Sequence, residues 1–138
     1  MTTFRAGIKN MSWYATTFEG SEKISKMKLS KNDARLLFYI LSKIDIDNRI
    51  HIPTYKELAK ELNMKEATVK KAFMTLRNND ILAKDIEQKK TVFINPDLFY
   101  AGYSSANDKK KSYFNKCKQE YSKRKKTKAP KKVPNQKP

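Results

Sequence analysis

Residues 54–82 constrain the fold of this chain more than any other stretch, because they carry the signals of two short helices in immediate succession. Their sequence is TYKELAKELNMKEATVKKAFMTLRNNDIL. Thr54 followed by Glu57, directly after a proline, predicts a helix that begins with a capping box. Asn63 tolerates the left-handed conformation found at helix ends, so we expect this helix to stop there. A second helix is predicted from about residue 66 to residue 78.

Each of these two predicted helices has one apolar face at helical spacing. The residues expected to point inward are Leu58, Ala59 and Leu62 in the first helix and Val69, Ala72, Phe73 and Leu76 in the second. The outward residues of the second helix include Thr68, Lys70, Lys71, Thr75 and Arg77. Two helices joined by a tight turn, here Asn63 and Met64, form the pattern of a helix-turn-helix motif. The second helix of such a motif enters the major groove of DNA.

Another helix and a strand are predicted before this motif. Ser30 and Asp33 have the spacing of a capping box, and the apolar residues expected to face the core are Ala34, Leu37, Phe38, Leu41 and Ile44. A turn at residues 45–48 and a short strand at residues 49–52 follow, closed by Pro53.

Two strands are predicted after the motif, at residues 81–86 and 91–94, joined by a polar hairpin tip at residues 87–90. Helix, strand, helix, helix and hairpin follow one another in the order of a winged helix-turn-helix fold, of the α+β class. We therefore expect a DNA-binding domain of this kind at residues 29–103, in which Leu98 and Phe99 pack back onto the core.

The two ends of the chain have a different composition. Residues 1–28 are expected to form an arm that docks on the core or on a second subunit, with Trp13 as the natural anchor among Phe4, Ile8, Met11, Tyr14 and Phe18. Residues 104–138 are a Lys-rich tail, predicted to be mostly disordered after a helix at residues 107–125. We expect Tyr113, Phe114 and Tyr121 on this helix to pack on the domain rather than to stack on bases.

The positive charge is concentrated in the tail. The net charge is +17, and residues 104–138 carry 13 Lys and Arg against 2 Asp and Glu, whereas residues 1–103 carry 18 against 12. Such an excess indicates a polyanionic partner. Tail lysines at 109–111 and 123–126 would add salt-dependent affinity without reading sequence.

Enzyme and metal chemistry find little support in the sequence. Cys117 and His51 are the only residues of their types, so no zinc site with several Cys and His ligands can be built, and His51 is expected to be a solvent-facing strand residue. The three glycines are too scattered for a phosphate-binding loop. We expect no catalytic residue, no metal and no cofactor. No apolar run is long enough for a membrane span, so a cytoplasmic protein associated with the nucleoid or a plasmid is expected.

Candidate DNA contacts follow from the motif. The predicted second helix presents Lys65, Glu66, Ala67 and Thr68 on its first turn and Lys70 and Lys71 on the next. Glu66 has a second interpretation, because a carboxylate at a helix start is favoured by the helix dipole without DNA. The start of the first helix, with Thr54, Tyr55 and Lys56, suits a phosphate contact. Lys89 and Lys90 at the hairpin tip are expected to contact the backbone or the minor groove, although a solvated turn would have the same composition.

The run from residue 29 to residue 102 resembles the small replication proteins of Gram-positive plasmids, the RepL type. The resemblance rests on LLFYILSKIDIDNRIHIPTYKELAKELNMKEATVKKAFMTLRNNDIL and on the end of the hairpin, VFINPDLFYAG. Many bacterial regulators share the helix-turn-helix part. The segment Ile94, Asn95 and Pro96, through which the chain leaves the hairpin, is more specific to this family. The resemblance implies binding to double-stranded DNA at a plasmid origin and recruitment of host replication proteins, without nicking or helicase activity.

Two other functions stay open at this point. The same fold serves transcriptional regulators of plasmid and phage operons. In the second alternative the chain is a protein-interaction module whose basic tail binds RNA. A homodimer is required if the DNA carries paired half-sites, and the aromatic arm at residues 4–18 is the candidate interface.

Overall fold

The structure is a computed structural model that describes residues 14–102 and 106–136, with side chains described up to residue 123. These residues form an α+β fold of five helices and one antiparallel sheet with the strand order β1-β3-β2. The helices are α2 (Phe18–Ser25), α3 (Lys31–Leu41), α4 (Tyr55–Leu62), α5 (Glu66–Asn78) and α6 (Asn107–Gln136). The strands are β1 (Arg49–His51), β2 (Leu82–Lys84) and β3 (Thr91–Ile94).

The predicted order of helix, strand, helix, helix and hairpin is the order of α3, β1, α4, α5, β2 and β3. The register pairs Ile50 with Val92 across β1 and β3, and Ala83 with Phe93 across β2 and β3. Strand β2 ends at Lys84, two residues earlier than predicted. It stops there because the next residue, Asp85, turns its carboxylate back to accept backbone N–H groups of the following loop.

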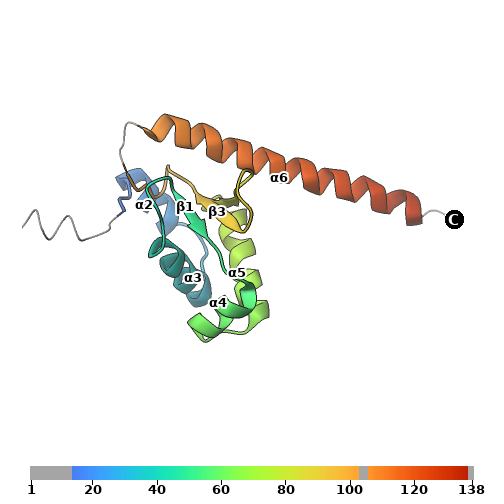
Figure 1. The fold of residues 1–138 in the computed structure, drawn as a ribbon, viewed down its shortest axis with the longest axis horizontal. Coiled ribbons are helices and arrows are strands. Elements are labelled where there is room, and N and C mark those ends of the chain that lie inside the picture. The colour runs from blue at the N-terminus through green and yellow to red at the C-terminus, as the bar shows by residue number, and fades with distance from the viewer. Residues whose placement is uncertain (1–13, 103–105, 137–138) are drawn as a thin grey trace, which may run out of the picture.

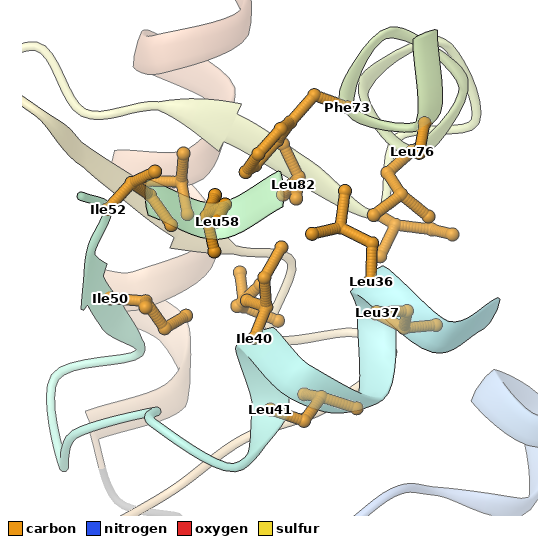
Figure 2. Packing of buried hydrophobic residues seen from close by; sticks show 14 of the residues in the cluster. Leu36, Leu37, Ile40, Leu41, Ile50, Ile52, Leu58, Phe73, Leu76 and Leu82 are labelled. Carbon is orange, nitrogen blue, oxygen red and sulfur yellow. The ribbon is translucent and has the colours of Figure 1, made fainter. Parts of the chain in front are cut away.

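The main core lies between helices α3, α4 and α5 and one face of the sheet. Figure 2 shows Leu36 and Ile40 of α3 pointing toward side chains from the other helices and the sheet. All seven residues that the sequence placed on the inner faces of α4 and α5 are buried. The motif is therefore held by apolar burial, and its polar residues are left on the outside.

The apolar face predicted for α3 is wrong in part. Leu36, Leu37, Ile40 and Leu41 are buried, whereas 62% of Phe38 is exposed and Ala34 and Ile44 are only half-buried. Residues 36–41 read LLFYIL, so several different helical faces satisfy the apolar spacing equally well. Packing against α5 decides between these faces, and the sequence of α3 alone does not.

Helix α2 was not expected, since residues 1–28 show no apolar period. Thr17 begins it by accepting a hydrogen bond from the backbone N–H of Gly20 at 2.8 Å.

The residues just before α2 contact the end of the domain. Tyr14 packs edge-on against Phe99 with ring centroids 5.7 Å apart, and Ala15 pairs with Tyr100 in an isolated β-bridge. Tyr14 therefore docks on the chain's own core, whereas Phe18 is almost fully exposed, so the expectation that it docks on the core is wrong. The expectations for Trp13, Phe4, Ile8 and Met11 lie outside the described residues.

The C-terminal segment contains the predicted helix, here called α6. The expected helix at residues 107–125 is present, and its backbone stays helical as far as Gln136. Figure 1 shows α6 lying along the sheet and then extending well beyond the rest of the fold. Phe114 packs on the domain as expected: together with Cys117 it is buried against Ala83 and Phe93 of the sheet.

A second anchor of α6 is the buried ammonium group of Lys110. Its Nζ donates to the carbonyl oxygens of Ala101 at 2.6 Å and Ile46 at 2.7 Å, and to Oδ1 of Asn48 at 3.2 Å. Asn48 is itself fully buried and donates to the carbonyl oxygens of Ile94 and Phe99. Burial lowers the pKa of Lys110. The expectation that residues 109–111 all offer free cations is therefore wrong for Lys110.

Candidate nucleic-acid interface

The start of α4 is set by Thr54. Its hydroxyl oxygen accepts a hydrogen bond from the backbone N–H of Glu57 at 3.2 Å, which is the first half of the predicted capping box. Ser30 and Asp33 make both bonds of such a box at the start of α3. Thr54 and Lys56 are exposed, so the first turn of α4 is open to solvent on the side where a phosphate contact was predicted.

The turn between α4 and α5 has the predicted geometry. Asn63 has φ 54° and ψ 52°, in the left-handed region that asparagine tolerates. The backbone N–H of Met64 donates to the carbonyl oxygen of Ala59 at 2.8 Å. Arg35 of α3 donates from Nη2 to the carbonyl oxygen of Leu62 at 2.6 Å. This bond satisfies one of the carbonyl groups left open at the end of α4 and fixes α4 against α3.

The outer face of α5 carries the predicted candidates. Lys65, Glu66 and Ala67 are exposed at its start, Thr68 is half-buried, and Lys70 and Lys71 are exposed on the next turn. Lys65 is the N-cap residue, and its side chain makes no capping hydrogen bond. The backbone N–H groups of the first turn of α5 are therefore not capped by the Lys65 side chain, and they lie beside exposed side chains.

Tyr55 links the two helices of the motif. Its ring lies 5.5 Å from that of Phe73 on α5, at an interplanar angle of 43°. Nζ of Lys70 lies 5.8 Å from the centre of the Tyr55 ring. Tyr55 is half-buried, so it is a packing residue on one side and an accessible aromatic surface on the other.

The loop between β2 and β3 carries Lys89 and Lys90, both exposed. Lys90 has φ 53°, and its carbonyl oxygen accepts a hydrogen bond from the backbone N–H of Ile52 at 2.7 Å. The hydroxyl of Thr91 donates to the carbonyl oxygen of Lys89 at 3.0 Å. These bonds hold the backbone of the loop end in one conformation next to the start of α4.

A buried carboxylate, Asp85, holds the start of the same loop. Its side chain is fully buried and accepts hydrogen bonds from Nε of Arg49 at 2.6 Å, from the Tyr113 hydroxyl, and from the backbone N–H groups of Glu87 at 2.8 Å and Gln88 at 3.1 Å. Burial raises the pKa of Asp85, but these four donors outweigh it and the net pKa is lowered. Burial and the bond to Asp85 raise the pKa of Tyr113 to about 12.

A cleft brings part of the predicted set together. It has a volume of about 270 Å³ and is lined by Thr54, Tyr55 and Lys90 among the predicted residues. Lys56, Lys89 and the candidates from Lys65 to Lys71 do not line it. They lie outside the cleft, on the outer faces of α4 and α5 and on the loop. The predicted residues thus fall into a cleft group and an outer group.

Two cations of the cleft, Arg77 and Lys84, were not among the predicted contacts. The sequence did contain a signal for them. Arg77 lies four residues after Phe73 on a helix, and Lys84 lies two residues after Leu82 on a strand. These spacings place each cation on the same side as its apolar neighbour. Sequence reasoning missed them because it did not show that α5 and β2 share a cleft.

In the part of the chain that the structure describes, no group of three or more His, Cys, Asp and Glu side chains is arranged to hold a metal ion. None of the described helices is long and apolar enough to cross a membrane.

The fold and this surface define a small basic α+β protein in which two helices joined by a tight turn present exposed lysines. Comparison with known families identifies it further: the chain belongs to the family of Firmicute plasmid replication proteins (RepL), whose model matches residues 21–136. This confirms the resemblance noted in the sequence. Searches of curated proteins and of solved structures gave no match.

Proposed function

We propose that this protein is a winged helix-turn-helix DNA-binding protein that initiates replication of a plasmid by binding specific double-stranded DNA at its origin. Membership of the plasmid replication family supports the process. Two observations carry the DNA-binding part. Exposed lysines lie on the outer face of α5, where Nζ of Lys70 is 5.8 Å from the centre of the Tyr55 ring at the start of α4, and Lys90 of the β2–β3 loop lines one cleft with Thr54 and Tyr55. It acts by binding alone, in the cytoplasm where its plasmid resides.

The residues divide into two roles under this proposal. Helix α5 enters the major groove, where Glu66 would accept from a cytosine amino group, Ala67 would touch a thymine methyl, and Lys70 or Lys71 would reach guanine. Phosphates on either side are contacted by the start of α4 and by the hairpin, which acts as the wing. The residues in this second set are Thr54, Tyr55, Lys56, Lys89 and Lys90.

The charge distribution supports a further feature of the binding. Lysines beyond the docked part of α6 lie on a helix that extends past the domain (Figure 1). They would neutralise phosphates along the duplex without reading bases, which makes affinity fall steeply with salt. Host replication proteins are the protein partners of an initiator of this kind, since the sequence contains no motif for unwinding or synthesis.

The test is selection of bound duplexes from sheared DNA of the plasmid and its host, at roughly physiological salt, where non-specific binding is weak. Enrichment of one cluster of repeats away from promoters is expected. Enrichment at promoters would instead make the protein a transcriptional regulator. No enrichment would contradict duplex recognition and favour an interaction module with an RNA-binding tail. Paired half-sites in the selected DNA would indicate a dimer.

A further inference from the structure

The cleft between the motif and the hairpin has the features of a ligand site. Its apolar wall comes from four separate segments of the chain, with Ile52, Pro53, Phe73, Leu82 and Val92 among its lining residues. Its volume, about 270 Å³, lies just below the usual range for small-molecule sites, roughly 300–1,000 Å³. A double helix cannot enter a space of this size, whereas one nucleotide of a single strand can.

The charges of the cleft all have one sign. Arg77, Lys84 and Lys90 line it, and none of its described lining residues is Asp or Glu. The described residues form no ion pair with these three cations. Arg77 stacks over the ring of Tyr121 on α6, 4.6 Å from its centre, so its guanidinium is oriented by the docked helix. An apolar cleft with only cations at its edge suits a ligand with a flat apolar body and a negative charge.

Tyr55 adds an aromatic surface to this cleft. Its ring is held by Phe73, at 5.5 Å, and remains half-exposed. Proteins that bind unpaired DNA combine aromatic rings, on which bases stack, with cations that follow the phosphates. The cleft offers both features next to each other. Thr54 also lines it and is exposed, and its hydroxyl hydrogen is left to donate to the edge of a base.

We propose that this cleft binds one unpaired nucleotide of a DNA strand, with the base against Tyr55 and the apolar wall and the phosphates on Arg77, Lys84 and Lys90. The inference rests on the proposed function, because it places the cleft beside a bound duplex. It adds a second activity to that function: the protein captures a strand as the origin opens. A free nucleotide has the same chemistry and is the other source of such a ligand.

The experiment compares three ligands of the full-length protein at one salt concentration. They are the selected duplex, the same duplex with a few mismatched pairs beside the site, and free deoxyadenosine monophosphate. The mismatched DNA is expected to bind about tenfold tighter than the paired duplex, which corresponds to roughly 1.4 kcal/mol and to the lower end of base–aromatic stacking. The free nucleotide is expected neither to bind measurably nor to compete.

The matched variants are Lys84→Glu and Lys116→Glu. Both lysines are exposed, but Lys116 lies on α6 and does not line the cleft. Both variants lose two units of charge, so the change in net charge is the same. Lys84→Glu is expected to lose most of the preference for mismatched DNA, and Lys116→Glu is expected to keep it. The ratio of the two affinities is the readout, since it cancels effects on duplex binding.

The outcomes separate this inference from the proposed function. Equal affinity for mismatched and paired DNA in the wild type, or an equal ratio in the two variants, overturns the cleft assignment and leaves duplex recognition standing. Binding of the free nucleotide in the cleft overturns the assignment to a DNA strand. Tight binding to mismatched DNA with no selected duplex sequence would contradict the proposed function while supporting the cleft.

Discussion

The hydroxyl of Tyr113 on α6 donates a hydrogen bond to the buried carboxylate of Asp85 at the start of the β2–β3 loop. Arg49 of β1 binds the other oxygen of the same carboxylate, and its guanidinium lies 5.0 Å from the centre of the Tyr113 ring. Asp85 therefore joins strand β1, the β2–β3 loop and the C-terminal helix. The conformation of the loop that carries Lys89 and Lys90 depends on the docking of α6.

Tyr113→Phe tests this dependence. The substitution keeps the ring against Phe93, 4.9 Å away, and removes only the hydrogen bond. Because the acceptor is a buried carboxylate, we expect a loss of about 1–3 kcal/mol in the free energy of unfolding, measured by urea denaturation. Tyr121→Phe is the control, since the described residues record no hydrogen bond to the Tyr121 hydroxyl. Equal stability of the two variants would contradict the role of Tyr113.

Acid should weaken the same cluster. The folded-state pKa of Asp85 is lowered from 3.8 by its four donors, so the unfolded chain takes up this proton at a higher pH than the folded protein does. The stabilisation by Asp85 is complete at neutral pH and is lost as the pH falls from about 4 through the folded-state pKa. Urea unfolding between pH 7 and pH 3 measures this loss.

Asp85→Asn should remove that part of the pH dependence and lower stability at neutral pH, whereas Asp108→Asn at the exposed start of α6 should leave the profile unchanged. A wild-type profile that matches the Asp85→Asn profile would show that the carboxylate contributes nothing through its charge.

Gly20→Ala tests the docking of α2. A Cβ atom at residue 20 would lie 2.9 Å from the carbonyl oxygen of Asp97 and 3.1 Å from Cα of Leu98, and both contacts are backbone. Alanine gains about 1 kcal/mol of helix propensity, but overpacking of this kind costs about 1–3 kcal/mol. We expect a net fall in melting temperature. Ser21→Ala on the exposed side of the same helix is the control, and a higher melting temperature for Gly20→Ala would contradict the packing.

Lys71→Ala tests helix α5 as a DNA contact. If Lys71 meets a phosphate, affinity should fall for all sequences alike, and the slope of log affinity against log salt should become shallower by roughly one unit. Filter binding at several salt concentrations measures both quantities. Lys116→Ala, an exposed lysine of α6, should have a smaller effect. Unchanged affinity of Lys71→Ala would remove this part of α5 from the interface.

Deletion of residues 124–138 tests the far half of α6. It removes seven Lys and Arg and leaves Lys110, Tyr113 and Phe114 in place, so the melting temperature should stay the same. Affinity for every duplex should fall, and the salt slope should become shallower by roughly one unit for each phosphate no longer contacted. Selection of bound sequences should return the same site. A different site would mean that this segment reads sequence.

The parts of the fold that sequence predicted well depend on local signals. The bounds of α5 and its four buried residues follow from apolar spacing and turn formers within 13 residues. The left-handed Asn63 follows from residue type alone. Helix α2 gave no such signal, because its buried residue is a glycine.

The parts that sequence missed depend on partners far apart in the chain. Tyr113 is 28 residues from Asp85, and Lys110 is 62 residues from Asn48. No local pattern relates such pairs, and a lysine in a run of lysines is indistinguishable from its neighbours. Arg77 and Lys84 were missed for the same reason, since only the fold brings them into one cleft.

The buried ammonium of Lys110 has a consequence for the direction of α6. Sliding the helix by one turn along the sheet would carry this charge away from its three oxygen acceptors, and an unpaired charge in the interior costs several kcal/mol. Apolar contacts alone would tolerate such a shift far more readily. Lys110 therefore fixes the position of α6 along the sheet, so that the projecting half of the helix leaves the domain in one defined direction.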